Sequence, residues 1–249
     1  MNSRDDKLVL NFSHASKPVF RFWLILSLGL AVIGVIQYLG ASAIAMMHFP
    51  EGYSIAGNFL SDLGRSTHDY SDLYNFSLIL LGIGLIPLFL TLTVVDPRDT
   101  FAMKLASGFG ILSAMGLVGL GLTPFDKFFI LHHIALGFWL FPMFYMAILF
   151  FYGASRSTYV GIGYLTASLL MVVIMLAVLL RADSTGYEVM QKMIVACGLV
   201  WLAYVVGFIF QSGRVILKSI RGPDLSREDA EDQYFSELYR QKAARERRT

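Results

Sequence analysis

The sequence predicts an all-helical membrane protein with six transmembrane helices, on the strength of three observations. Apolar residues make up 56% of the 249 positions, the mean hydropathy is +0.61, and the apolar residues gather in six long stretches. A soluble domain of this length rarely has such a composition. None of the stretches contains Asp, Glu, Lys or Arg. They cover residues 22–47, 73–95, 105–123, 128–152, 158–180 and 193–210.

Each stretch is close to the roughly 20 residues that a helix needs to cross about 30 Å of hydrocarbon. The first is too long for the core of a signal peptide, and no small-residue cleavage site follows it, so we expect a retained helix. The short links leave no room for a second folded domain. We therefore expect an N-terminal segment over residues 1–21, a six-helix transmembrane domain over 22–210 and a tail over 211–249.

The third stretch carries small residues at four-residue spacing, namely Ala106, Gly110 and Ala114, with Gly108 and Gly116 on a neighbouring line. Small residues let helices approach one another closely in lipid. We expect this helix to lie at the centre of the bundle and all of these residues to serve packing.

The basic residues predict the orientation. Sixteen of the 20 Lys and Arg residues lie in the N-terminal segment, the tail and the two links on the same side, whereas Arg65, Lys127, Arg181 and Lys192 lie in the opposite loops. Cytoplasmic loops are enriched in Lys and Arg. Both termini should therefore be cytoplasmic, with residues 48–72, 124–127 and 181–192 on the exoplasmic side. We expect the plasma (cell inner) membrane.

The tail predicts an amphipathic helix. Ser226 followed by Asp229 is a typical helix N-terminal cap, and Tyr234 and Leu238 continue an apolar stripe at four-residue spacing. Acidic residues begin this segment and basic residues end it, which matches the helix dipole. We expect a helix that lies on the lipid headgroups. A helix that binds a protein partner is the alternative.

Every histidine except His14 lies on the predicted exoplasmic side. His132 and His133 lie about 6–8 Å below the outer end of the fourth stretch, at 1.5 Å per residue. Because adjacent helix positions point about 100° apart, we expect one ring to face the bundle and the other a neighbouring helix or the headgroups. Polar groups at this depth often mark functional sites. The alternative is a pair of interfacial histidines bonded to Asp126 or to a loop carbonyl.

Residues 52–66 form a segment too apolar for a free loop and too broken by small residues for a span. We expect it to lie over the helix ends, with a short helix that stops at Gly64. Ser61 and Asp62 would then lie at the mouth of the bundle. The alternative is a structural turn in which Asp62 caps the amides that follow it and pairs with Arg65.

The block N-F-L-S-D-L-G at residues 58–64, Asn75 at the start of the next helix, and the P-F-D turn at 124–126 that leads into His132 and His133 form one pattern. It resembles the six-helix membrane family catalogued as domain of unknown function 998, over essentially the whole transmembrane region. A more remote similarity links the Ser-Asp-x-Gly block to the Frag/DRAM/Sfk membrane proteins, which are associated with lipid and GPI-anchor handling. The first resemblance implies the topology and no particular reaction.

The function we favour from the sequence is lipid binding or lipid handling in a polar pocket at the exoplasmic mouth, and the sequence does not specify the molecular activity. Membrane lipid is the expected partner because the pocket would open at headgroup height. The candidate binding residues are Asn58, Arg65, Asn75, Asp126, Arg181 and Glu188.

The alternative is a zinc-dependent intramembrane hydrolase that acts on a lipid or an amide. Catalytic zinc takes about three protein ligands and a water, and the candidate ligands are His68, His132, His133 and Asp62, with His48 and Asp126 as further choices. The candidate catalytic residues are Ser61, Asp62 and His133. This logic resembles that of the CREST hydrolases, but their His-x3-His pair on the last helix has no counterpart in the sixth stretch.

Several other classes of function are disfavoured. Ion-coupled pumps usually place ionisable groups near the membrane midplane, and none lies there. A haem protein would need axial histidines on facing helices, yet only the fourth stretch has any. Signatures for nucleotides or nucleic acids are absent, and the lone Cys197 rules out a disulfide within the chain.

Overall fold

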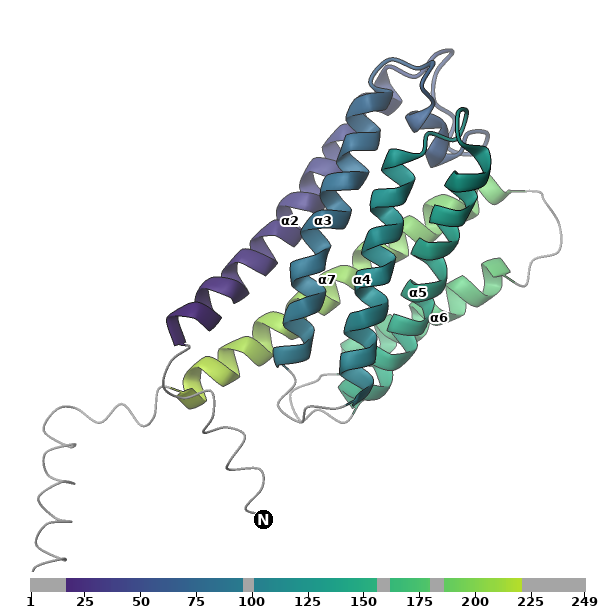
Figure 1. The fold of residues 1–249 in the computed structure, drawn as a ribbon. Coiled ribbons are helices and arrows are strands. Elements are labelled where there is room, and N and C mark those ends of the chain that lie inside the picture. Colours follow the sequence, from purple (N-terminus) through teal and green to yellow (C-terminus); the bar gives the residue numbers. More distant parts are fainter. Residues whose placement is uncertain (1–16, 96–100, 156–161, 180–185, 221–249) are drawn as a thin grey trace, which may run out of the picture. The chain divides into compact units, whose positions relative to one another are not determined.

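The computed structural model describes residues 17–95, 101–155, 162–179 and 186–220. Within these ranges the regular elements are six α-helices and one 3-10 helix, with no strand (Figure 1), so the all-helical fold class is confirmed. The helices are α2 (Lys17–Met47), η1 (Leu60–Gly64), α3 (Ser71–Val95), α4 (Phe101–Leu122), α5 (Phe129–Ser155), α6 (Ile162–Leu179) and α7 (Tyr187–Ile220).

Residues 18–213 make up one compact unit, which contains nearly all of the described chain. Lys17 and residues 214–220 belong to a second unit, of which the structure describes only these helix ends. The predicted amphipathic helix of the tail lies outside the described residues, as do the first 16 residues and Arg181.

Five of the helices are long and apolar enough to cross a membrane: Pro18–Met47, Ser71–Val95, Phe101–Leu122, Phe129–Ser155 and Tyr187–Leu217. The chain is thus a multi-pass integral membrane protein. The apolar part of α6, Gly163–Ala177, is shorter than the other five, and α6 is flanked on both sides by residues outside the described ranges. The count of six spans therefore stays a prediction.

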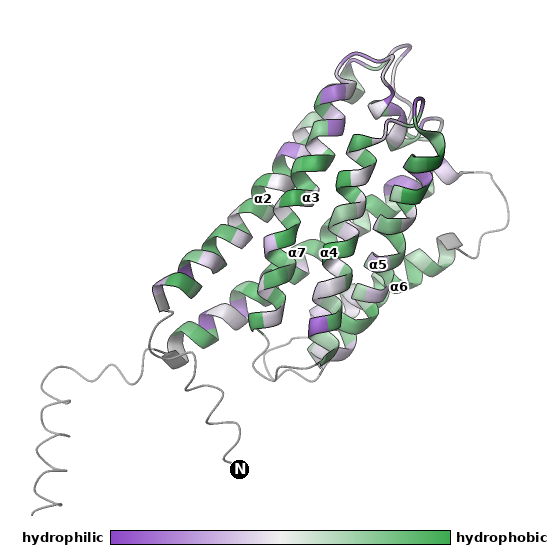
Figure 2. Cartoon of the chain, viewed as in Figure 1, coloured by the Kyte–Doolittle hydropathy of each residue, from purple (hydrophilic) through white to green (hydrophobic). Residues whose placement is uncertain are grey.

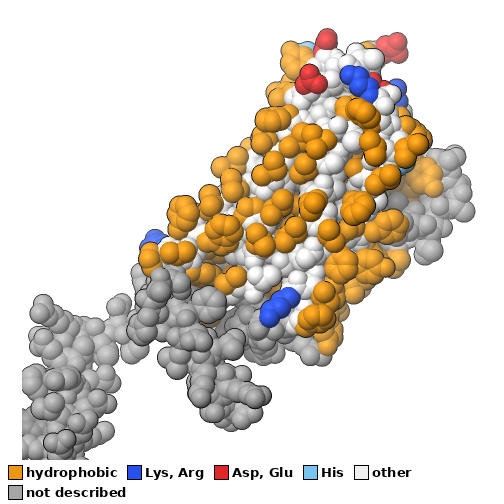
Figure 3. All heavy atoms as spheres, viewed as in Figure 1, with side chains coloured by type: hydrophobic (Ala, Val, Ile, Leu, Met, Phe, Trp, Pro, Cys, Tyr) orange, Lys and Arg blue, Asp and Glu red, His pale blue; other side chains and the backbone are white. Residues whose placement is uncertain are grey.

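Large apolar side chains cover the outside of the helices. Phe22, Ile33, Ile83 and Phe138 are each more than half exposed, and Figure 2 shows the helices apolar along most of their length. On the face drawn in Figure 3, the acidic and basic side chains lie toward the ends of the helices and apolar side chains fill the space between them. Such a surface would be unfavourable in water but is well solvated by lipid chains.

Helix α4 packs between α3 and α5, as the small residues predicted. Ala106 and Ala114 are fully buried. A Cβ atom at Gly110 would come within 2.6 Å of the Phe89 ring on α3, and one at Gly116 within 2.6 Å of the Phe138 backbone on α5. The prediction was wrong for Gly108, whose missing side chain faces open space, because this position lies about 200° around the helix from Gly110.

Helix α2 pairs with α3, and α7 contacts both α5 and α6. The Gln37 amide on α2 donates to the Ser77 carbonyl oxygen on α3 at 2.8 Å. The Trp201 indole on α7 packs edge-on against the Phe150 ring on α5, and its Nε1 donates to the Ser168 hydroxyl on α6 at 3.0 Å. These contacts set the walls of the cavity described below.

Candidate functional site

Four segments meet at one end of the unit, which we call the loop end: residues 48–70, the start of α3, the turn between α4 and α5, and the start of α7. The predicted short helix that stops at Gly64 is confirmed as η1. Its Leu60 amide donates to Gln191 Oε1 on α7 at 2.7 Å. The ammonium group of Lys192 donates to the carbonyl oxygens of Asn58 and Glu188. The first turns of α7 therefore hold the loop over the helix ends.

Asp62 is buried at the centre of this loop. Its Oδ2 accepts a hydrogen bond from the Phe59 amide at 2.7 Å, and its Oδ1 pairs with the Arg65 guanidinium at 2.8 Å. The backbone oxygen of Asp62 also lies 3.0 Å from His68 Nδ1. The structural interpretation of Asp62 as the ion-pair partner of Arg65 is confirmed, although the amide that it caps precedes it. Both carboxylate oxygens are engaged within the loop, which leaves Asp62 poorly placed to act as a base or ligand.

Asn75 and Gly64 join the loop to α3. The buried Asn75 amide donates to the Gly64 carbonyl oxygen at 2.9 Å. A Cβ atom at Gly64 would overlap the Asn75 side chain oxygen, so only glycine allows this close approach. The candidate binding residue Asn75 is therefore engaged by the backbone of η1.

Asp126 ties the turn between α4 and α5 to the same loop. Its carboxylate accepts hydrogen bonds from the Ser66 amide at 3.1 Å and the Ser66 hydroxyl at 2.5 Å. Partial burial raises the pKa of Asp126, but the hydrogen bonds from Ser66 and the nearby charge of Lys127 outweigh it, so the net pKa is lowered. The Arg65 guanidinium lies 5.6 Å from the centre of the Phe125 ring in this turn.

The four histidines in the described residues share one arrangement. Each Nδ1 lies within hydrogen-bond distance of a backbone carbonyl oxygen: His48 with Ile44, His68 with Asp62, His132 with Thr123 and His133 with Phe129. A carbonyl oxygen only accepts, so Nδ1 must carry the proton. Nε2 of the neutral ring is then a hydrogen-bond acceptor.

His132 and His133 face different surroundings, as their adjacent helix positions predicted. His132 is buried and His133 is exposed. The 2.7 Å contact between His132 and the Thr123 carbonyl is the loop-carbonyl bond of the alternative interpretation.

The predicted zinc site is not assembled in the described part of the chain. No group of three or more His, Cys, Asp or Glu residues there is arranged to hold a metal ion. The candidate ligands His68, His132, His133 and Asp62 are instead held by separate neighbours. Each imidazole bonds to a backbone carbonyl, and Asp62 pairs with Arg65.

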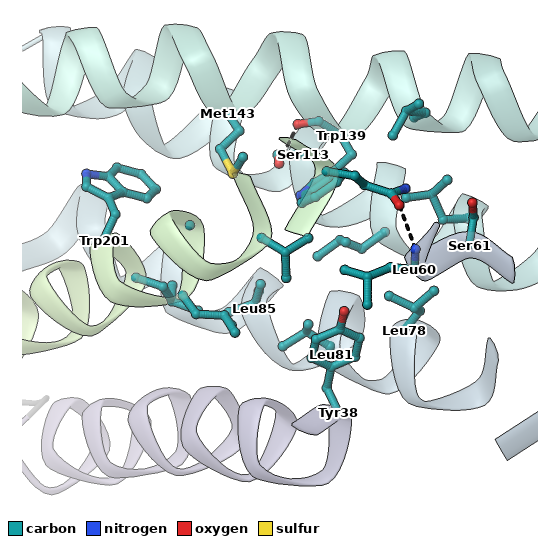
Figure 4. Close-up of a pocket in the computed structure, with 18 of the residues that line it drawn as sticks. Tyr38, Leu60, Ser61, Leu78, Leu81, Leu85, Ser113, Trp139, Met143 and Trp201 are labelled. Atoms are coloured by element: carbon teal, nitrogen blue, oxygen red, sulfur yellow. Dashed lines mark hydrogen bonds between the residues drawn. The ribbon is translucent and has the colours of Figure 1, made fainter. Parts of the chain in front are cut away.

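A cavity of about 90 Å³ runs inward from the loop end between the helices (Figure 4). Measured along α5 at 1.5 Å per residue, its lining extends about 21 Å, from His132 to Met146. Helices α2, α3, α4, α5 and α7 and the short helix η1 contribute its lining, which is Tyr38, Leu60, Ser61, Tyr74, Leu78, Leu81, Leu85, Phe89, Ser113, Leu117, Leu120, His132, Leu136, Trp139, Met143, Met146, Gln191, Val195, Gly198, Leu199, Trp201 and Leu202.

The polar groups of this lining are concentrated toward the loop end. Ser61, Tyr74, His132 and Gln191 lie on η1 or within the first turns of α3, α5 and α7. In Figure 4, Ser61 lies at one end of the cavity and Trp201 at the other, with Tyr38 reaching in from α2.

The deeper polar atoms of the lining are already paired. The Ser113 hydroxyl donates to the Trp139 carbonyl oxygen at 2.9 Å, and the Trp201 indole donates to Ser168. The inner part of the cavity therefore presents an apolar surface.

Three tyrosines lie beside the polar end. The Tyr38 and Tyr74 rings are 6.1 Å apart and their hydroxyl groups interact. The Tyr53 hydroxyl, in the loop, is buried and has no hydrogen-bond partner within the described residues. Burial, with the negative charge of Asp62 as a smaller cause, raises the pKa of Tyr53.

Comparison of the chain with protein-family models, curated proteins and solved structures finds no match. The geometry of the site is therefore the basis for any functional conclusion.

The structure separates the predicted site residues into three groups. Ser61 and His132 line the cavity. Asn58, Asp62, Arg65, His68, Asn75, Asp126 and Glu188 take part in the contacts that hold the loop end together. Glu188 does so through its backbone oxygen, and Asn58 through its backbone oxygen and through its side chain Oδ1, which accepts from the Ser54 amide at 2.8 Å. His133 is exposed, and Arg181 lies outside the described residues.

The sequence analysis missed most of the cavity lining, including Tyr38, Gln191 and Trp201. One signal was available in the helical spacing of Gln191, Val195, Gly198 and Leu202, which share one face of α7. In an apolar span, however, many faces have such a spacing, so the pattern alone does not identify a cavity.

Proposed function

We propose that this protein binds one single-chain amphiphile, with its apolar chain inside the cavity and its polar group at the loop end. The observation that carries the proposal is the change in polarity along the lining. Hydrogen-bonding groups that are not fully paired lie toward the loop end, at Ser61, His132 and Gln191, and the inner part is lined by Leu, Met, Phe and Trp side chains.

The dimensions favour one chain over two. A volume of about 90 Å³, distributed along about 20 Å of helix, leaves room across its width for no more than one methylene chain. A lipid with two acyl chains would have to leave one of them outside the bundle.

The polar end would dominate recognition. An acyl chain that moves from the bilayer into an apolar cavity exchanges one apolar environment for another, so it gains little from the hydrophobic effect. Hydrogen bonds between the polar group of the ligand and the cavity lining are made in a largely water-free site, where an unpaired polar group is costly. Ser61, His132 and Gln191 would therefore determine which ligand binds. The length of its acyl chain would determine how deep the ligand reaches into the cavity.

We further propose that the loop end faces the exoplasmic side of the plasma (cell inner) membrane. The distribution of the basic residues, sixteen against four, supports this orientation. The ligand would then enter from the outer leaflet, at the height of the headgroups.

Binding is proposed in place of the zinc-dependent hydrolysis that the sequence left open. The described residues assemble no set of zinc ligands, and the carboxylate of Asp62 is engaged by Arg65 and the loop backbone. We propose the six-helix topology that the family resemblance implies, and this resemblance implies no particular activity.

Filling the cavity tests the proposal. Gly198 lines the cavity, and a Cβ atom there would meet only ordinary contacts, the nearest at 3.8 Å, so Gly198→Leu should occupy the inner part without breaking the bundle. The matched control is Gly108→Leu, the same change at a position with open space. Photo-cross-linking of an oleoyl glycerol that carries a diazirine in its chain should fall at least tenfold in Gly198→Leu and stay at the wild-type level in the control. Equal labelling of the two variants would overturn the proposal.

A further inference from the structure

We infer that the ligand is an electrically neutral fatty-acid derivative with a hydroxyl or N–H group that donates to His132 and a carbonyl group that accepts from Gln191. This inference rests on the proposed binding of an amphiphile. It adds the chemical class of the polar group, and it follows from which atoms at the loop end of the cavity still lack a partner.

The described lining of the cavity offers no charge to a charged ligand. Among the residues that the structure describes, it contains no Asp, Glu, Lys or Arg side chain. The cations nearby are engaged elsewhere: Arg65 pairs with Asp62, and Lys192 donates to two backbone carbonyl oxygens and lies 5.3 Å from the centre of the Tyr53 ring. A phosphate or carboxylate at this end would be desolvated without a counter-charge, which is strongly unfavourable.

His132 supplies a hydrogen-bond acceptor. Its Nδ1 carries the proton donated to the Thr123 carbonyl oxygen at 2.7 Å, so Nε2 of the neutral ring keeps a lone pair. The ring is buried in the cavity wall. A ligand that fills this end must bring a donor to this nitrogen or leave it unpaired, which disfavours groups that only accept, such as a methyl ester.

Gln191 and Ser61 supply the complementary groups. The Oε1 atom of Gln191 is fixed by the Leu60 amide at 2.7 Å, which orients the side chain and leaves its NH₂ group as a donor. The Ser61 hydroxyl has no hydrogen-bond partner in the part of the chain that the structure describes, and it can donate or accept. Together with His132 these residues match an ester or amide carbonyl next to a hydroxyl, as in a monoacylglycerol or an N-acyl ethanolamide.

A competition series with one acyl chain and different polar groups tests the inference. The full chain in detergent micelles is labelled with the diazirine oleoyl glycerol, and monooleoylglycerol, methyl oleate, oleate and oleoyl lysophosphatidate compete for the site. We expect monooleoylglycerol to compete at least tenfold better than each of the others. Equal or better competition by the anionic lipids would overturn the inference of a neutral ligand, and equal competition by methyl oleate would overturn the inference of a donor to His132.

Two adjacent histidines provide the matched variants. His132→Ala should reduce the preference for monooleoylglycerol over methyl oleate to less than threefold, whereas His133→Ala, next to it and exposed, should keep the wild-type preference. Ser61→Ala should weaken the competition by monooleoylglycerol threefold to tenfold. This change removes no hydrogen bond from the described structure, so its effect is independent of any loss of folding in His132→Ala. An unchanged preference in both His132→Ala and Ser61→Ala would overturn the inference.

The series also separates this inference from the proposed function. If wild-type protein binds all four lipids and Gly198→Leu binds none, the cavity binds an amphiphile but the inferred polar group is wrong. If folded wild-type protein captures none of the probes, the proposed function itself fails.

Discussion

The amide of Leu60 and the side chain oxygen of Gln191, 131 residues apart, are joined by a hydrogen bond of 2.7 Å. This bond fixes the start of η1 to the second turn of α7, beside the polar end of the cavity. One side chain therefore does two things: its oxygen holds the loop, and its NH₂ group remains for a ligand. The stability of the loop end and ligand binding should be coupled through Gln191.

The first prediction concerns this bond. Gln191→Leu leaves the buried Leu60 amide without its partner, and an unmade hydrogen bond of this kind costs about 1–3 kcal/mol. We expect a lower thermal unfolding midpoint and faster hydrogen exchange at residues 58–64. The control is Met193→Leu, on the same helix but exposed, which should leave both quantities unchanged. Wild-type exchange of the loop in Gln191→Leu would contradict the role of the bond.

The second prediction concerns the close approach of Gly64 and Asn75. Gly64→Ala places a Cβ atom on the Asn75 side chain oxygen, so the loop must shift and the 2.9 Å bond to the Gly64 carbonyl oxygen must lengthen. We expect a loss of about 1–3 kcal/mol in the free energy of unfolding. Gly40→Ala, at a helical position with open space, should be neutral or slightly stabilising.

A double-mutant cycle checks the cause of that loss. If the clash with Asn75 is responsible, adding Asn75→Ala to Gly64→Ala should be less destabilising than the sum of the two single changes. Strict additivity would show that the effect of Gly64→Ala arises elsewhere, for instance at the Tyr74 ring, 3.3 Å from the added atom.

The third prediction concerns the pH dependence of the stability of the folded protein, to which Asp126 contributes. Because its pKa is lower in the folded protein than in the unfolded chain, folding favours the ionised form. The stabilisation is therefore fully present above the unfolded pKa of about 3.9, and it is lost as pH falls through the lowered folded value. The difference in unfolding midpoint between wild type and Asp126→Asn should be positive from pH 5 to pH 7 and should shrink below about pH 4.

Ser66 provides the matching variant for this measurement. Ser66→Ala removes the hydroxyl that donates to Asp126 at 2.5 Å but keeps the backbone amide that donates to the same carboxylate. The pH-dependent difference should therefore become smaller without disappearing. A difference that stays constant down to pH 3 in the wild-type background would contradict a lowered pKa for Asp126.

Much of the helical fold could be predicted from the sequence because long apolar runs without charges leave few alternatives. The short helix that ends at Gly64, the ion pair of Asp62 with Arg65 and the different surroundings of His132 and His133 were also predictable, since each depends on residues close together in the chain. The zinc site stays a prediction that the described residues do not support, since no three of their His, Cys, Asp or Glu side chains are grouped to hold a metal ion. Whether such residues meet depends on contacts between distant loops, which the residue types do not show.

The cavity could not be predicted for a different reason. Leu80 and Leu81 are identical neighbours on α3, yet Leu80 is 39% exposed and Leu81 is 4% exposed. In a helix that is apolar on all sides, the composition does not distinguish the face toward lipid from the face toward the bundle. Which face is buried depends on partners such as Gly34 on α2, which lies against Leu81, and these contacts join distant parts of the chain.

The last prediction tests the orientation on which the proposed entry route depends. Thr67 and Lys127 are exposed residues next to Ser66 and Asp126, which are bonded to each other, so the two positions must lie on the same side of the membrane. Ser155 is exposed at the opposite end of α5, about 39 Å from Phe129 along the helix. In a Cys197→Ser background, a membrane-impermeant maleimide added to intact cells should label Thr67→Cys and Lys127→Cys, whereas Ser155→Cys should react only after the membrane is opened.

Labelling of Ser155→Cys alone in intact cells would show that the orientation is the reverse of the proposed one and that the polar end of the cavity lies on the cytoplasmic side. Labelling of Thr67→Cys without Lys127→Cys would contradict the contact between Ser66 and Asp126, and with it the arrangement of the loop end.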